Sequence, residues 1–351
     1  MKLYVTSLID NEQRNKSGHL YKVDHETGNI EKKKMMEPTL AYTERRVAPD
    51  PCRENQVGGP PGLRGISIYN DKVYCANSDS IFCYDRNLNL LKDKTIQNKS
   101  TDLNSLHDIF VENEDSIWVL STGNNRVVKI NNRGDIKEEI DFTSDDMLEK
   151  LKEMHFLLKY RINRIMKENL NSESSKEIVF RMNTLAKNKE KLYVFLQKLE
   201  LLLQIKPEIK IIWFVNNTNN LIERKLPFIN SKVNMQGGMD CEFIDSHTII
   251  MNNTPEKKLE FYNIQKQKHM YSLAPFELGA NLEKEGNGNQ YKHQNYLRGL
   301  KYLENSNTLL IGSSPAKIIE LDLKNNQVIR EIELEKTPGH LIYDIEAAQE
   351  N

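Results

Sequence analysis

The sequence predicts an all-β protein with the architecture of a six-bladed β-propeller. Three observations lead to this prediction. A pattern of four short apolar strands repeats along the chain, each chain end holds part of one such unit, and the long irregular segments fall between units. We therefore expect a single domain over residues 1–351, with one α-helical insertion between the third and fourth blades.

The repeated unit is clearest in residues 63–85, LRGISIYNDKVYCANSDSIFCYD, where small polar turns separate strand-like apolar runs. Four units follow this layout closely: blade 2 at 62–96, blade 3 at 105–142, blade 5 at 237–276 and blade 6 at 296–335. Blade 4, at 179–228, is less regular, and its apolar residues also fit a pair of helices. Five regular blades plus a helical region is therefore the alternative fold.

Blade 1 is predicted to form from both ends of the chain. Residues 338–351 supply one innermost strand, and residues 1–35 supply the other three. Pairing of the two ends would close the ring and leave no open sheet edge between the first and last blades.

The long insertions all connect a fourth strand to the next first strand, so they should gather on one face of the ring. They are residues 36–62, 143–178 and 277–296. Long loops grouped on a rigid scaffold commonly carry binding and catalysis. The first-to-second turns, by contrast, are all tight.

The insertion at 143–178 predicts one helix of about six turns, because its apolar residues recur at helical spacing. It opens with Thr143 and Asp146 in a capping-box arrangement, and we interpret His155 as a surface or packing residue. The apolar stripe is Met147, Leu151, Met154, Leu158, Ile162 and Ile165. We favour packing of this stripe on the propeller or a second subunit over a lid above the channel.

Basic residues stand at the start of most innermost strands. They are Arg64, His107, Arg181, Arg298 and His340, with Met239 as the exception. Because side chains alternate between the two faces of a strand, these basic residues can point into the central channel. Repulsion between their positive charges there requires compensating negative charge. Arginine forks could bind an external carboxylate, phosphate or sulfate, or they could pair with Asp108, Asp240 and Asp344.

The strand pattern and the turns ETGNI, NNRGDI and KNNQVI resemble those of six-bladed NHL and gluconolactonase-like propellers, and also of virginiamycin B lyase-like propellers. The gluconolactonase resemblance implies a divalent metal in the channel, to which Asn183, Asp240 and Asp344 could contribute. The lyase resemblance implies a histidine general base, a role open to His107 or His340. The pairing of His and Arg is also similar to that in arylsulfate sulfotransferases.

Composition excludes several functions. Lys+Arg 49 against Asp+Glu 50 leaves no global basic surface for nucleic acid, and no apolar run is long enough to span a membrane. Cys52, Cys75, Cys83 and Cys241 form no Cys-x-x-Cys pair, so neither zinc nor disulfides are predicted. The expected location is cytoplasmic.

Two hypotheses of function follow. The first is an enzyme of lyase, hydrolase or isomerase type whose channel binds an anionic small molecule. Its substrate-binding residues would be Arg64, Arg181, Arg298, Asp108, Asn183 and Asp240, with His107 or His340 transferring a proton. The second is a non-catalytic scaffold that binds a protein partner, or a second copy of the chain, through helix 143–178.

Overall fold

A computed structural model provides the structure of the protein. It describes residues 1–9, 18–35, 63–77, 80–97, 103–170, 180–215, 229–230, 238–254, 256–281, 295–337 and 339–349. The predicted insertion at 36–62 and most of that at 277–296 lie outside these residues.

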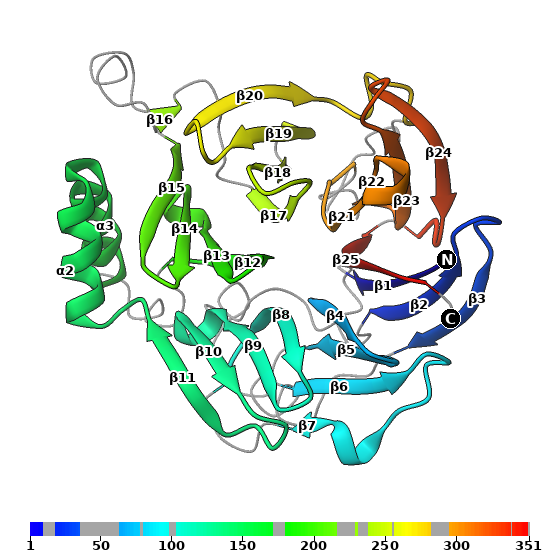
Figure 1. Ribbon diagram of the computed structural model, residues 1–351, viewed down its shortest axis with the longest axis horizontal. Coiled ribbons are helices and arrows are strands. Elements are labelled where there is room, and N and C mark those ends of the chain that lie inside the picture. The colour runs from blue at the N-terminus through cyan, green and yellow to red at the C-terminus, as the bar shows by residue number, and fades with distance from the viewer. Residues whose placement is uncertain are drawn as a thin grey trace.

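Six antiparallel sheets surround a common axis, as the six-bladed prediction requires (Figure 1). Each sheet begins with its innermost strand and continues outward. Blade 1 is β25 (His340–Ala348), β1 (Lys2–Ile9), β2 (His19–Asp24) and β3 (Ile30–Met35). Blade 2 is β4 (Ile66–Tyr69), β5 (Lys72–Ala76), β6 (Ser80–Asp85) and β7 (Ile96–Gln97). Blade 3 is β8 (Leu106–Asn113), β9 (Ser116–Ser121), β10 (Arg126–Ile130) and β11 (Ile136–Asp141).

The second half of the ring repeats this arrangement, with one addition. Blade 4 is β12 (Met182–Asn188), β13 (Lys191–Leu196), β14 (Leu201–Lys206) and β15 (Lys210–Val215), to which β16 (Ile229–Asn230) adds in parallel. Blade 5 is β17 (Gly238–Phe243), β18 (Thr248–Asn253), β19 (Lys258–Asn263) and β20 (Lys268–Leu273). Blade 6 is β21 (Leu300–Leu303), β22 (Thr308–Ser313), β23 (Lys317–Asp322) and β24 (Gln327–Glu333). Blade 4 is therefore a sheet, which rejects the helix-pair alternative.

The two chain ends close the ring, as predicted. Strand β1 pairs antiparallel with β25 from Lys2 opposite Ala348 to Ile9 opposite His340. The register shifts by a bulge between Thr6 and Ser7. Because this pairing joins the N- and C-terminal segments within one sheet, no edge is left open between blades 1 and 6.

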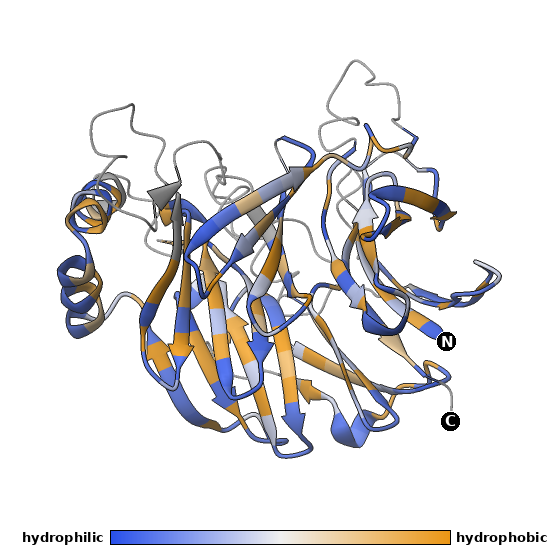
Figure 2. Ribbon diagram, turned by 45° about the horizontal axis from the view of Figure 1, so that its top comes forward, coloured by the Kyte–Doolittle hydropathy of each residue, from blue (hydrophilic) through white to orange (hydrophobic). Residues whose placement is uncertain are grey.

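The core is divided among the spaces between blades. Apolar and polar residues alternate along the strands (Figure 2), and the buried ones fill layers between neighbouring sheets. Between blades 2 and 3, for example, Ala76, Leu106 and Val119 are fully buried in one apolar cluster. Full burial of one such aliphatic side chain contributes about 1.5–3 kcal/mol to stability.

The insertion forms two helices, α2 (Asp145–Met154) and α3 (Phe156–Leu170), so the prediction of one continuous helix was wrong. His155 between them is extended, with φ −165° and ψ 136°, and its Nδ1 accepts a hydrogen bond from Leu157 N at 3.1 Å. A buried imidazole thus satisfies an amide at the start of α3 while breaking the first helix. The N-cap of α2 is Ser144, whose side chain accepts from Met147 N.

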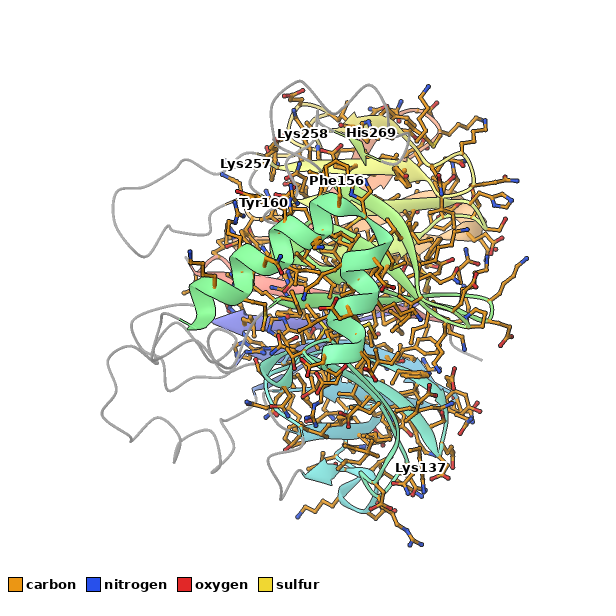
Figure 3. The ribbon with its side chains drawn as sticks, turned by 90° about the vertical axis from the view of Figure 1, so that its left-hand side faces the viewer. Lys137, Phe156, Tyr160, Lys257, Lys258 and His269 are labelled. Carbon is orange, nitrogen blue, oxygen red and sulfur yellow. The ribbon has the colours of Figure 1, made fainter. Side chains whose placement is uncertain are left out.

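The helices pack on the outside of the ring beside blades 3 and 4 (Figures 1 and 3). Leu151, Leu158 and Ile162 are fully buried in the cluster that contains Phe142 and Phe180. The buried stripe therefore packs on the propeller, which is the role that the sequence favoured over a lid. Neither helix has an apolar stretch long enough to cross a bilayer.

Candidate functional site at the propeller axis

Three aspartates on alternate blades connect the innermost strands around the axis. They are Asp108 on β8, Asp240 on β17 and Asp344 on β25. One oxygen of each accepts the amide of its own following residue, namely Ile109, Cys241 and Ile345, each at 2.8 Å. The other oxygen accepts an amide of the next blade: Leu185 at 2.7 Å, Leu300 at 3.0 Å and Ile66 at 2.9 Å. Each aspartate thus joins an odd-numbered blade to an even-numbered one.

Small residues on the even-numbered blades permit this close approach. A Cβ added to Gly65 would lie 2.5 Å from Asp108 Cα, and one added to Gly299 would lie 3.2 Å from Asp344 Cα. Gly299 also has φ +77°, which disfavours a side chain. On blade 4 the equivalent residue is Thr184, whose Oγ1 donates toward Asp240 at 2.9 Å and toward Asp108 at 3.2 Å. These two glycines are therefore required by strand convergence.

The three carboxyl groups favour protonation more than ordinary aspartates do. Burial is the main cause, and repulsion between neighbouring carboxylates adds to it for Asp108 and Asp344. The pKa of Asp108 rises to about 8 and that of Asp240 to about 6, whereas amide hydrogen bonds act in the opposite direction. The charge of Arg298 also favours the ionised form of Asp240 and so lowers its pKa.

The aspartates fix which residues are equivalent around the ring. In blades 1, 3 and 5 the aspartate is directly preceded by Tyr343, His107 and Met239, respectively. In blades 2, 4 and 6 the equivalent position directly precedes the small residue that faces the aspartates, and it holds Arg64, Asn183 and Arg298. Three of these six are basic, whereas the sequence alignment predicted five. Arg181 lies two residues before the equivalent position, and His340 lies three residues before it.

Four of the predicted basic residues nevertheless interact electrostatically, because the charges of three arginines act on His107. His107 is only 5% exposed, and burial lowers its pKa well below the usual range. The positive charges of Arg64, Arg298 and Arg181 lower that pKa further, in this order of effect. His107 is therefore a neutral imidazole at physiological pH, surrounded by cations.

Tyr343 completes this cluster, although the sequence pattern did not predict it. Its hydroxyl lies 3.0 Å from His107 Nδ1, and the Arg298 guanidinium carbon lies 3.2 Å from the centroid of its ring. A buried cation–π contact of this kind contributes about 2 kcal/mol. The Tyr343–Asp344 doublet matches the His107–Asp108 doublet, and that match was the available signal in the sequence.

The two most buried arginines are held by different neighbours. Arg64 is fully buried, and one terminal nitrogen donates to Ser105 Oγ at 3.2 Å and to the Leu106 carbonyl at 3.1 Å. Arg298 is 6% exposed and rests on Tyr343. Arg181 is exposed and has φ +50°. Asn183 is buried and donates to Gln197 Oε1 at 2.9 Å.

His340 lies apart from this cluster. Its neighbours are Ser7, His19 and Tyr21 of the same blade. Burial and the charge of His19 lower its pKa to about 3. The prediction that His340 belongs to the basic ring was based on the wrong register for the last strand.

The residues that the gluconolactonase resemblance offered for a metal do not form a metal site. The Asp240 and Asp344 oxygens accept backbone amides, and Asn183 bonds Gln197. Within the described part of the chain, no group of three or more His, Cys, Asp or Glu side chains could hold a metal ion. The described cysteines, Cys75, Cys83 and Cys241, are buried free thiols.

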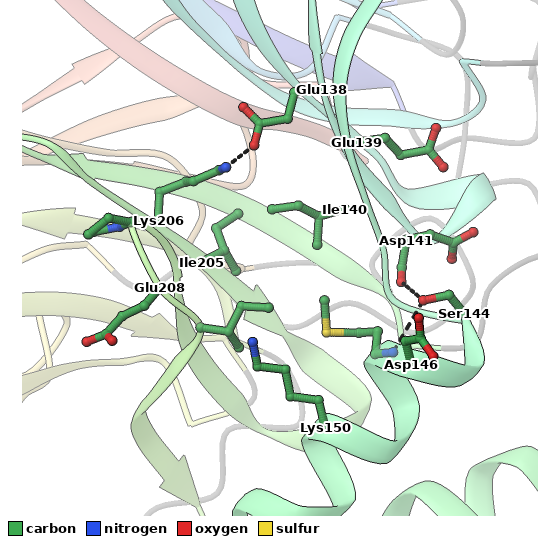
Figure 4. Close-up of a pocket in the computed structure, with 13 residues that line it drawn as sticks. Glu138, Glu139, Ile140, Asp141, Ser144, Asp146, Lys150, Ile205, Lys206 and Glu208 are labelled. Carbon is green, nitrogen blue, oxygen red and sulfur yellow. Dashed lines mark hydrogen bonds and ion pairs between the residues drawn. The ribbon is translucent and has the colours of Figure 1, made fainter.

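A separate pocket of about 430 Å³ lies near the outer edge of blades 3 and 4 (Figure 4). Strand β11, the start of α2 and the turn between β14 and β15 line it. Its acidic residues include Glu138, Asp141, Asp146 and Glu208, and Lys206 forms an ion pair with Glu138. None of the axial arginines lines this pocket.

Comparison with known proteins agrees with the fold. The structure is similar to that of a protein of unknown function from Bacteroides caccae, with a TM-score of 0.59, 11% identity, and 98% of this chain and 97% of that chain covered. It is also similar to a chain of a nidogen–laminin complex, with a TM-score of 0.53, 10% identity, and 98% and 97% covered. Virginiamycin B lyase from Staphylococcus aureus aligns with a TM-score of 0.46 and 9% identity over 81% of this chain and 73% of that chain.

The prediction of a six-bladed propeller is confirmed by the six sheets themselves. No family model and no curated protein sequence matches the chain. The resemblance to NHL and gluconolactonase-like propellers stays a prediction.

Proposed function

We propose that the propeller binds an anionic small molecule at its axis and transfers a proton to or from it, in a lyase, hydrolase or isomerase type of reaction. The ligand would carry a carboxylate, phosphate or sulfate group. The observation that supports this proposal most strongly is that the positive charges of Arg64, Arg298 and Arg181 all act on the buried His107.

Electrostatics gives the reason for an anion. Two unit charges about 10 Å apart repel by about 1.7 kcal/mol at an effective dielectric near 20. Three guanidinium groups that act on one buried imidazole therefore make negative charge beside them favourable. A bound oxyanion would offset them through charge-assisted hydrogen bonds, for which the planar guanidinium group is well suited.

His107 and Tyr343 are the groups that we propose for proton transfer. Burial lowers the pKa of His107 and the three arginines lower it further, so bound negative charge beside them would raise this pKa toward the range where imidazole works as a base. The Tyr343 hydroxyl at 3.0 Å could pass a proton to Nδ1 or receive one. Binding and basicity would then be coupled, because the anion that docks also activates the histidine.

Anion binding can be measured directly by calorimetry with sulfate, phosphate and acetate. We expect at least one of these anions to bind, and Arg298→Gln to weaken its binding at least tenfold because one of three cations is lost. Arg133→Gln is the matched control, since Arg133 is an exposed arginine in the turn between β10 and β11. No binding to the wild type, or equal binding to both variants, would reject the proposal.

A second candidate function is a platform for protein binding, favoured by two exposed aromatic residues. Phe156 and Tyr160 of α3 are 56% and 63% exposed, and they stand one helical turn apart (Figure 3). Aromatic residues are enriched at interfaces. The nidogen–laminin complex is an assembly of two proteins, and it contains a propeller of similar fold.

Sedimentation separates this candidate from the first. If α3 joins two copies of the chain, the wild type should sediment as a dimer and the Phe156→Ser/Tyr160→Ser variant as a monomer. The same variant should bind anions normally. A monomeric wild type would remove the homodimer form of this candidate.

A further inference from the structure

A second group of polar side chains lies in blade 1, away from the axial arginines. Ser7 comes from β1, His19 and Tyr21 from β2, and His340 from the start of β25. All four therefore lie in the sheet that the two chain ends build together. Ser7 follows directly the bulge in the pairing of β1 with β25.

Three polar atoms of this group surround one nitrogen. From His340 Nε2, Ser7 Oγ lies at 2.8 Å, His19 Nδ1 at 3.4 Å and the Tyr21 hydroxyl at 3.4 Å. An imidazole nitrogen offers either one proton or one lone pair, so it makes one good hydrogen bond. Ser7 takes that bond, and the two contacts at 3.4 Å exceed what the nitrogen can satisfy.

The spacing of these atoms also fits that of ligand atoms around a metal ion. A tetrahedral ion with bonds of about 2.0–2.1 Å holds its ligand atoms about 3.3–3.4 Å apart. Both 3.4 Å separations match this spacing. The centroids of the His19 and His340 rings are 5.0 Å apart, and the ring planes differ by 27°.

We propose that His19 Nδ1, His340 Nε2 and the Tyr21 hydroxyl oxygen bind one divalent late transition-metal ion of the zinc or copper class. Imidazole nitrogen suits both ions, and the phenol oxygen would release its proton to solvent on binding. Because its third ligand is a tyrosine, this set differs from the common sites built from His, Cys, Asp and Glu alone.

Ser7 can release His340 without losing its own hydrogen bonds. Its Oγ accepts the amide of His19 at 2.9 Å and lies 3.3 Å from the His19 carbonyl. When the metal occupies the lone pair of Nε2, the Ser7 hydroxyl can turn its proton to this carbonyl. Ser7 then remains satisfied and continues to position His19.

Most of the group is shielded from solvent. Ser7 and Tyr21 are fully buried and His340 is 2% exposed. The charged side chains Lys33 and Glu335 also act on His340, and they pair with each other at 2.8 Å. Lys33 also lies 5.5 Å from the centroid of the Tyr21 ring.

Titration of the full chain with Zn²⁺ and with Cu²⁺ tests this site, with Mg²⁺ as the negative probe. We expect one equivalent of Zn²⁺ or Cu²⁺ to bind and Mg²⁺ not to bind. His19→Ala and Tyr21→Phe should each weaken binding at least tenfold. The matched control is His269→Ala, which changes a histidine on β20 that contacts Glu260 instead.

Electron paramagnetic resonance of the Cu²⁺ form identifies the ligands independently of affinity. The wild type should show hyperfine coupling to two imidazole nitrogens, and His340→Gln should show one. Should His340→Gln fail to fold, His19→Ala gives the same readout from the other ring. Absence of binding at millimolar Zn²⁺ and Cu²⁺, or equal binding by the His19→Ala and His269→Ala variants, would overturn the proposal.

Discussion

His107 and His340 both lie on innermost strands and both are buried neutral imidazoles, yet their surroundings are opposite in character. His107 faces three arginines and the Tyr343 hydroxyl at the axis. His340 faces Ser7, His19 and Tyr21 inside a single sheet. The residue type is the same, and the register of the strand decides which environment it enters.

The carboxylates of alternate blades set this register. Asp108 follows His107 directly and anchors the next blade, whereas His340 stands four residues before Asp344. His107 thus belongs to the cationic cluster because it directly precedes an axial aspartate. Arg64 and Arg298 belong to it because each directly precedes the small residue that an axial aspartate approaches. Arg181 reaches it by another route, from an exposed position two residues ahead of Asn183.

Removal of an axial anchor should have the largest effect. Asp108→Ala leaves the amides of Ile109 and Leu185 without their acceptor in a buried place. We expect a loss of about 2–4 kcal/mol in the free energy of unfolding, since each orphaned group costs about 1–3 kcal/mol. Urea denaturation measures this loss, with the exposed Asp115→Ala as the control. An Asp108→Ala variant as stable as the control would contradict the anchoring role.

The axial Asp108 and the blade 1 residue His340 should also respond oppositely to pH. The raised pKa of Asp108, about 8, means that the folded chain holds a proton that the unfolded chain releases near pH 4, so its contribution to stability is lost as pH rises toward 8. The lowered pKa of His340, about 3, gives the reverse sign, with stability rising up to about pH 6.5.

Variants separate these contributions. Between pH 6.5 and 8, Asp108→Asn should reduce the decline in the free energy of unfolding by up to about 1.4 kcal/mol per pH unit, the value for one proton. Some decline should remain, because the pKa of Glu242 is also raised, to about 7. His340→Gln should reduce only the rise in the free energy of unfolding on the acid side of the pH profile, below about pH 6.5. Identical pH profiles for both variants and the wild type would break the comparison.

The blade 1 cluster should be less sensitive to the loss of one hydrogen bond. Ser7→Ala removes the acceptor of the His19 amide and the partner of His340 Nε2. We expect a destabilisation of about 1–2 kcal/mol in thermal or urea unfolding. The exposed Thr27→Ala should change stability by less than about 0.5 kcal/mol. A loss at Ser7 larger than that at Asp108 would reverse the expected ranking.

The smallest effect on stability should come from Arg181, which is exposed. Arg181→Gln should change the free energy of unfolding by less than about 0.5 kcal/mol while weakening anion binding severalfold. Lys189→Gln is a close control, because Lys189 is also exposed, also has positive φ and flanks the other end of β12. Equal anion affinity in these two variants would remove Arg181 from the binding cluster.

Much of the architecture could be predicted because it depends on local pattern. Alternating apolar residues and tight polar turns specify blades, and two incomplete ends specify their own pairing. The break at His155 could not be predicted in this way, since it depends on a buried imidazole that accepts the Leu157 amide in the folded chain. The apolar stripe continues across the break and gives no sign of it.

The site could be predicted only in part for a similar reason. Arg64, His107, Arg181 and Arg298 were grouped because they begin successive units, and their role as a site stays a prediction. In blade 4 the equivalent place is taken by Asn183, where Arg181 was predicted. In blade 1 it is taken by Tyr343, where His340 was predicted. A shift of two residues within a strand start leaves the alternation of apolar residues unchanged, so hydropathy alone did not reveal the register of blade 4. The Asp doublets carry that information, because their hydrogen bonds cross from blade to blade.

The most direct test of the central claim is anomalous diffraction from crystals soaked in selenate, a tetrahedral oxyanion that selenium makes visible. We predict a selenium peak at the axis, within hydrogen-bonding distance of the Arg64, Arg181 or Arg298 side chains and near His107. Selenate that binds only at surface lysines, with no peak at the axis, would contradict the account.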